Sequence, residues 1–156
     1  MAFSIRSSAF SDGQRIPPRY SRDGGNISPH LEWSDAPAGT KSYVLVVEDP
    51  DAPHGTFRHW AAYDIPAQSH ALPEGAGSAQ GAVPVKMAVN DFGNHQYDGP
   101  QPPLGHDAHH YYFRLAALDV ANLSVPPHAR VAEVWKAARA HTIAAAEMVG
   151  TFRRTQ

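Results

Sequence analysis

The feature that most limits how this chain can fold is the run SYVLVVE at residues 42–48, followed directly by DPDAP at residues 49–53. A mostly apolar, β-branched run of this length is typical of a strand that is buried on both faces. Proline lacks an amide hydrogen and fixes its own φ angle, so two prolines in five residues prevent the strand from continuing. The sequence therefore predicts a central strand that ends near Asp49, with the Asp49 and Asp51 carboxylates on a rigid loop.

Further strands are predicted on both sides of this central one. Apolar and polar residues alternate, or β-branched and aromatic residues gather, in several short segments bounded by proline and glycine. These patterns predict strands at residues 3–6, 31–33, 60–65, 83–92, 110–119 and 146–152, with loops at 68–81 and 93–105. The 14 prolines in 156 residues favour many turns over a helical bundle.

One helix is predicted after the pair Pro126-Pro127, with proline tolerated in its first turn and an end near His141. One apolar face of this helix is formed by residues at positions i, i+3, i+4 and i+7, which are Val131, Val134, Trp135 and Ala138. Many short strands with one short helix predict a mainly β fold of two packed antiparallel sheets. The length predicts a single domain over residues 1–156.

Composition excludes several classes of function. The chain has no cysteine, which excludes disulfides, thiolate catalysis and zinc sites built on sulfur. The net charge is −2 without a long basic cluster, so general binding to nucleic acid is not expected. No apolar run is long enough for a signal peptide or a membrane span, which leads us to expect a cytoplasmic protein without integral membrane association.

Titratable side chains gather where the predicted strands begin or end. Asp49 and Asp51 follow the central strand, and His59 precedes the next one. His109 and Tyr111 are two residues apart, so they share one face of a strand, whereas His110 points the other way and is expected to be structural or exposed. These positions could converge at one end of the sheets.

Other interpretations of the same residues remain open. Asp49 and Asp51 could simply form an Asx-type turn. His106, Asp107 and His109 have types that bind zinc or nickel, although no further ligand follows at a typical spacing, so we expect no metal or other cofactor. Aspartate–histidine pairs also serve in acid–base catalysis. No serine or threonine stands in a nucleophile elbow, and we therefore expect a protein that is not an enzyme.

Taken together, these segments resemble the phosphatidylethanolamine-binding protein (PEBP) family, including its bacterial Raf kinase inhibitor-like members. The similarity extends in order along almost the whole chain. It rests on NISPHLEW at 26–33, DPDAP at 49–53, His59-Trp60, DFG at 91–93, YDGP at 97–100, HHYYFRLAALD at 109–119 and GTF at 150–152. DPDAP alone would be a weak signal, but its combination with the later blocks is specific.

The resemblance implies a fold of two antiparallel sheets with an anion pocket at one end. The ligand-binding residues that it implies here are Asp49, Asp51, His59, Gly99, Pro100, His109 and Tyr111. It also implies a cis bond at Ala52-Pro53, because many members have a cis proline in this motif. Vertebrate members continue into a C-terminal helix that helps cover the pocket, so a chain ending at Gln156 is expected to have a more open site.

The expected chemistry is the binding of a phosphate group. His59, His109 and the Tyr111 hydroxyl can donate hydrogen bonds to it, and a carboxylate can orient a histidine ring and favour its charged form. The expected ligand is a small anion such as a phosphoethanolamine-like headgroup. The alternatives are a protein-interaction module that inhibits a kinase or protease and, less favoured, a hydrolase. A protein partner and a homodimer are both compatible with the resemblance.

Overall fold

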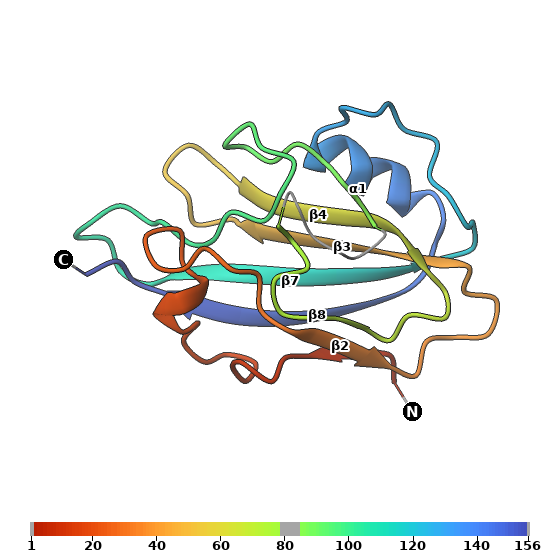
Figure 1. Ribbon diagram of the computed structural model, residues 1–156, viewed down its shortest axis with the longest axis horizontal. Helices are drawn as coiled ribbons and strands as arrows, with labels where there is room; N and C mark the ends of the chain where they lie inside the picture. The colour runs from red at the N-terminus through yellow and green to blue at the C-terminus, as the bar shows by residue number, and fades with distance from the viewer. Residues whose placement is uncertain (1, 79–84, 156) are drawn as a thin grey trace.

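The computed structural model describes residues 2–78 and 85–155. Figure 1 shows how its helices and strands are arranged, coloured in the order of the chain. They are β1 (Ser4–Arg6), the 3-10 helix η1 (Pro18–Tyr20), β2 (Leu31–Ser34), β3 (Ser42–Asp49), β4 (Phe57–Pro66), β5 (Ala71–Leu72), β6 (Lys86–Met87), β7 (His109–Leu118), α1 (Val131–Arg139) and β8 (Thr142–Phe152).

The strands form two antiparallel sheets, which confirms the predicted fold class. The larger sheet has the order β6-β4-β3-β7-β8, and the smaller has the order β1-β2-β5. The smaller sheet packs on one face of the larger one, and α1 packs on the opposite face beside β3 and β4 (Figure 1). None of the helices among the described residues is long and apolar enough to cross a membrane.

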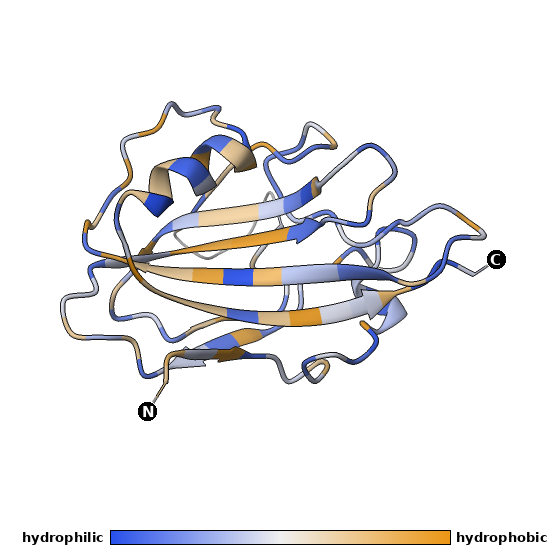
Figure 2. Cartoon of the chain, turned by 180° about the vertical axis from the view of Figure 1, so that it is seen from behind, coloured by the Kyte–Doolittle hydropathy of each residue, from blue (hydrophilic) through white to orange (hydrophobic). Residues whose placement is uncertain are grey.

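Strand β3 lies at the centre of the larger sheet, and Figure 2 shows that it is largely hydrophobic. It is buried on both faces, as predicted. Because successive side chains of a strand point in opposite directions, β3 contributes to two separate cores. Leu45 and Val47 belong to the core between the sheets, together with Trp60 and Phe113. Val44 and Val46 belong to the core beneath α1.

Several boundaries differ from the predictions for local physical reasons. Helix α1 begins at Val131 rather than beside Pro126-Pro127, and the Arg130 backbone N–H is satisfied by the Glu133 carboxylate at 3.1 Å. The strand predicted at 83–92 is reduced to Lys86–Met87, and residues 83 and 84 lie outside the described residues. Strand β8 begins at Thr142, earlier than predicted, because its pairing with β7 continues to Thr142 across a register shift at Ile143. The short strand β5 lies in a segment predicted to be a loop.

One end of the larger sheet gathers the segments that were singled out in the sequence. Strand β3 ends there, β4 and β7 begin there, and β8 ends there, because neighbouring strands are antiparallel (Figure 1). The turn at 50–56 and the loop at 93–108 cover this end. The fold therefore brings together polar side chains that are up to 60 residues apart in the sequence, such as Asp49 and His109.

Candidate functional site

A pocket of about 250 Å³ opens at this end of the sheet. Four of the seven predicted site residues line it: Asp49, His59, His109 and Tyr111. The remaining lining is mainly apolar and aromatic. It consists of Ala52, Pro53, His54, Phe57, Phe92, Gln101, Pro102 and Pro103. A few polar groups in an otherwise apolar wall are typical of a small-molecule site, where the polar groups fix the orientation of the ligand.

Asp49 has two structural roles at the end of β3. Its Oδ1 accepts the Asp51 backbone N–H at 2.8 Å, which is the Asx turn considered from the sequence. Its Oδ2 accepts a hydrogen bond from His109 Nδ1 at 2.6 Å. The turn and the contact with the histidine thus coexist, and both carboxylate oxygens of this buried side chain are used.

His109 and Tyr111 lie on the same face of β7, as their spacing predicted. Both side chains are buried, whereas His110 between them is exposed. Because a carboxylate can only accept, the proton of the His109–Asp49 bond lies on Nδ1, and Nε2 is directed toward Nδ1 of His106 at 3.2 Å. Asp49 therefore fixes the orientation of the His109 ring, as expected for at least one aspartate.

The Tyr111 hydroxyl is a buried polar group without a hydrogen-bond partner among the described residues. Burial and the nearby Asp49 carboxylate raise the pKa of Tyr111 above that of an ordinary phenol. The hydroxyl therefore keeps its proton at neutral pH and remains a hydrogen-bond donor. A buried donor without a partner is costly, so this atom favours a ligand that brings an acceptor.

His59 is held from behind by the main chain of Asp98. Its Nδ1 lies 2.7 Å from the Asp98 carbonyl oxygen, which can only accept, so Nδ1 carries the proton. Burial lowers the pKa of His59, and this effect outweighs the attraction of the Asp49 and Asp98 carboxylates. A neutral ring of this tautomer has an unprotonated Nε2, so the expectation that His59 donates to an anion is not supported.

Asp98 lies beneath the pocket in a closed network of hydrogen bonds. Its buried carboxylate accepts from the side-chain amides of Asn26, Asn90, Asn94 and Gln96 at 2.8–2.9 Å. Burial opposes ionisation of this carboxyl, but the four hydrogen bonds outweigh it and hold the pKa of Asp98 below its ordinary value. The network ties the loop at 90–98 to the His59 side chain.

Asp51 points away from the pocket. Its carboxylate accepts from the backbone N–H and from Nδ1 of His110, both at 2.8 Å, and its side chain is 43% exposed. Burial opposes ionisation here too, but the bonds from His110 hold the pKa of Asp51 below its ordinary value. Asp51 therefore fastens the β3–β4 turn to the start of β7 and supports the pocket from outside its lining.

Gly99 and Pro100 also lie outside the pocket lining, although both are buried. The Gly99 backbone N–H donates to the Asn26 side-chain oxygen at 2.8 Å, so it is not available to a ligand. A Cβ atom built on Gly99 would lie 2.0 Å from the Tyr20 carbonyl oxygen. Glycine is needed here because two backbone segments approach closely beside the site.

Replacing Gly99 with alanine is therefore expected to destabilise the fold by about 3 kcal/mol, because the added methyl group meets backbone atoms that cannot move freely. Gly55→Ala is the matched control, since Gly55 has a φ of 103° but open space around its Cβ position. It should cost only about 1 kcal/mol, from backbone strain alone. Urea unfolding of both variants measures the difference, and equal costs would contradict the steric explanation.

Comparison with known proteins agrees with this arrangement. The family model described as phosphatidylethanolamine-binding protein matches residues 6–153. A UPF0098 protein of Aquifex aeolicus is 44% identical over 96% of this chain and 88% of the relative, and YbhB of Escherichia coli is 41% identical over 94% of this chain and 97% of its own. The chain belongs to the phosphatidylethanolamine-binding protein family. The crystal structure of Escherichia coli YbcL, described as a member of the mammalian PEBP family, has a TM-score of 0.95 and 33% identity over 99% of this chain and all of that one.

One expectation drawn from the PEBP family is wrong for this chain. The Ala52-Pro53 bond, expected to be cis, is trans, and no other peptide bond among the described residues is cis. The turn is held by hydrogen bonds that its own aspartate carboxylates accept. Asp49 accepts from the Asp51 backbone, and Asp51 accepts from His110. These bonds fix the direction of both carboxylates without a cis proline.

The sequence did not single out two aromatic walls of the pocket, Phe57 and Phe92. Their rings are 4.8 Å apart, and each contacts the His59 ring edge to face. The Arg22 guanidinium lies over Phe92 at 4.1 Å and 3.7 Å from the Asp98 carboxylate. Phe92 belongs to the DFG block on which the resemblance to the PEBP family rests, so this block could have identified Phe92 as a pocket residue.

Among the described residues, no third ligand joins His106 and His109 to form the metal site considered from the sequence. His106 and His109 face each other at 3.2 Å, but among residues 2–78 and 85–155 no group of three or more histidine, aspartate or glutamate side chains is arranged to hold a metal ion. Asp107 is exposed on the loop. His109 is instead accounted for by its bond to Asp49.

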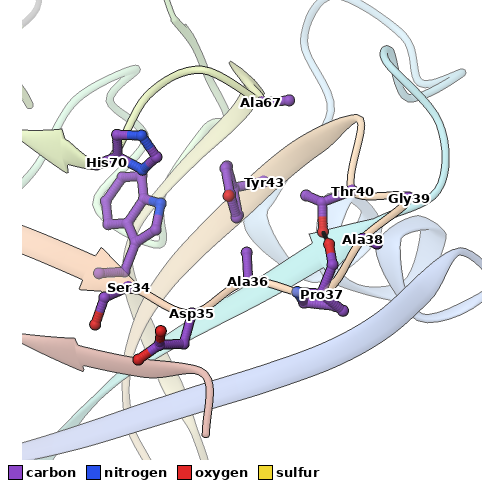
Figure 3. A pocket seen from close by; sticks show the side chains of 11 residues that line it. Ser34, Asp35, Ala36, Pro37, Ala38, Gly39, Thr40, Tyr43, Ala67 and His70 are labelled. Atoms are coloured by element: carbon purple, nitrogen blue, oxygen red, sulfur yellow. Dashed lines mark hydrogen bonds between the residues drawn. The ribbon is translucent and has the colours of Figure 1, made fainter. Parts of the chain in front are cut away.

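A second hollow, of about 380 Å³, lies at the other end of β3 (Figure 3). The loop at 34–40 forms one side of it, and Tyr43, Ala67 and His70 complete the wall. Its carboxylate and imidazole side chains, Asp35 and His70, are exposed to solvent, and its buried titratable side chain is Tyr43. The first pocket instead has a buried carboxylate bonded to a buried imidazole, and it is therefore the candidate functional site.

Proposed function

We propose that this protein binds a small phosphate-bearing ligand in the pocket formed by Asp49, His59, His109 and Tyr111. The observation that carries the proposal is the buried bond between Asp49 and His109, which holds an imidazole ring in the pocket wall. A ring fixed in this way is prepared to meet an anion without losing side-chain freedom on binding. Membership of a ligand-binding family agrees with this interpretation.

The donors available to an anion are few and specific. The Tyr111 hydroxyl has no partner among the described residues. His109 can donate from Nε2 only as the imidazolium ion, because Nδ1 already donates to Asp49, and the ligand would take the place of His106 Nδ1, which lies 3.2 Å from this nitrogen. In that form the charge on the ring would attract the anion, while the Asp49 carboxylate balances the charge on its other side.

The same features favour binding over catalysis. Both oxygens of Asp49 already accept hydrogen bonds, so this carboxylate is not free to act as a base on a ligand. His59 has one nitrogen committed to the Asp98 carbonyl group. Hydrolysis of a phosphate ester by the wild-type protein, lost on replacing His109, would contradict a purely binding role.

Calorimetric titration with inorganic phosphate and with phosphoethanolamine at pH 6 tests the proposal directly. Both are expected to bind. Binding of neither ligand would contradict the proposal.

A further inference from the structure

The pocket contains a hydrogen-bond acceptor that a fully deprotonated anion cannot satisfy. His59 donates from Nδ1 to the Asp98 carbonyl oxygen at 2.7 Å. The two nitrogens lie on different sides of an imidazole ring, so the second nitrogen, Nε2, faces away from Asp98. In the neutral tautomer that this bond selects, Nε2 has a lone pair and no proton.

Several contacts keep the His59 ring in this orientation. The Phe57, Phe92 and Tyr111 rings all meet it edge to face, with ring centroids between 5.1 and 5.6 Å from its own. The Asn90 side-chain amide donates to the His59 backbone carbonyl and to the Asp98 carboxylate. The ring thus cannot easily turn over to present a protonated nitrogen to the pocket.

Asp49 adds a second reason why the pocket disfavours an anion with no proton of its own. Its carboxylate is buried and negative, and it lines the pocket. A dianion in the pocket would face this charge and the His59 lone pair together. Burial lowers the pKa of His59, which supports the neutral form of the ring.

We infer that the pocket selects phosphate that keeps a P–OH group, as dihydrogen phosphate or as the monoanion of a phosphate monoester, and that this P–OH group donates to His59 Nε2. This inference rests on the proposed function and narrows it to one ligand class. In this arrangement Tyr111 donates to one remaining phosphate oxygen, and His109, released from its contact with His106, donates to another. His59 accepts the hydrogen bond of the P–OH group. Each hydrogen-bond donor of the pocket then faces an acceptor on the ligand, and the acceptor nitrogen of His59 faces a donor.

The consequence is selectivity between anions of almost the same shape. Sulfate has the size and tetrahedral form of phosphate but carries no proton near neutral pH. Dimethyl phosphate has the phosphodiester chemistry of a lipid headgroup and also has no P–OH group. Phosphate monoesters retain one proton on roughly half of the molecules near pH 6. The pocket is therefore expected to bind soluble phosphate and phosphate monoesters more tightly than the phosphodiester of a lipid headgroup.

The experiment is a calorimetric titration of the wild-type protein at pH 6 with inorganic phosphate, methyl phosphate, sulfate and dimethyl phosphate at equal ionic strength. Inorganic phosphate and methyl phosphate are expected to bind at least about 10-fold more tightly than sulfate and dimethyl phosphate. The latter two have no P–OH group, so they place an anion oxygen against the buried acceptor nitrogen of His59. Equal affinities for all four would overturn the inference and leave the proposed function standing. No binding of phosphate at all would overturn both.

A substitution at His59 tests the cause of the selectivity. In His59→Asn the amide nitrogen can take the place of Nδ1 and donate to the Asp98 carbonyl group, but no acceptor replaces Nε2. The ratio of phosphate to sulfate affinity is expected to fall from about 10 to within about 3-fold of unity. His70→Asn, an exposed histidine in the other hollow, should leave the ratio unchanged.

An unchanged ratio in a folded His59→Asn protein would overturn the role of His59. Circular dichroism and thermal unfolding establish that the variant is folded before titration. If it does not fold, the four wild-type titrations still decide whether the pocket requires a proton on the ligand.

Discussion

Replacing His109 with alanine is expected to weaken the binding of inorganic phosphate at pH 6 by about 100-fold. The substitution removes the only imidazole that Asp49 orients in the pocket, and it leaves the buried Asp49 carboxylate with one hydrogen bond fewer. The remaining negative charge then faces the incoming anion without a cation between them. Calorimetry on the folded variant measures the loss.

His110→Ala is the matched control for this prediction. His110 is the next residue of β7 and also bonds an aspartate, but it is exposed and lies on the opposite face of the strand. Its removal should change the phosphate affinity by less than about 3-fold, as expected for an exposed ion pair. Wild-type affinity in a folded His109→Ala protein would remove His109 from the site.

Replacing Asp98 with asparagine is expected to have the largest effect on stability, about 3 kcal/mol of unfolding free energy. This corresponds to a fall of roughly 10 °C in melting temperature for a domain of this size. The Asp98 side chain is 1% exposed and accepts hydrogen bonds from four side-chain amides. In the asparagine variant, an NH2 group replaces one carboxylate oxygen and faces the N–H donors of these neighbours. Thermal unfolding at pH 7 measures the effect.

The pH dependence of this effect has a defined sign. The pKa of Asp98 is lowered in the folded protein, so its contribution to stability is complete above the ordinary aspartate pKa of about 4 and is lost as the pH falls further. The difference between wild type and Asp98→Asn should therefore shrink below pH 4. Asp119→Asn, which alters an exposed ion pair with His141, should cost less than about 0.5 kcal/mol at any pH. An equally small cost for Asp98→Asn would contradict the network.

Patterns within one strand were predictable from the sequence. Burial of β3 on both faces follows from its unbroken apolar run, and the shared orientation of His109 and Tyr111 follows from their spacing of two. Both depend only on local geometry. The alternation of Ala146, Met148, Gly150 and Phe152 likewise predicted the buried face of β8.

Features that depend on partners distant in sequence were not predictable. Nothing in the local sequence shows that the Asp98 carbonyl group lies behind His59, and this contact decides which nitrogen of the ring carries the proton. The direction of Asp51 away from the pocket depends in the same way on His110, 59 residues later. The late start of α1 reflects Glu133 satisfying the Arg130 backbone, which competes with the proline signal.

The position of the polar groups at strand ends has a consequence for the dynamics of the site. Asp49, His59 and His109 belong to β3, β4 and β7, which are adjacent strands of one sheet. Asp49 pairs with Phe57 of β4 and His109 pairs with Phe152 of β8, so neighbouring strands restrain the backbone at the site. The recognition geometry thus exists before any ligand arrives, and binding needs little reorganisation of the main chain. A receptor of this kind is preorganised: the entropy of ordering its binding groups has been lost during folding.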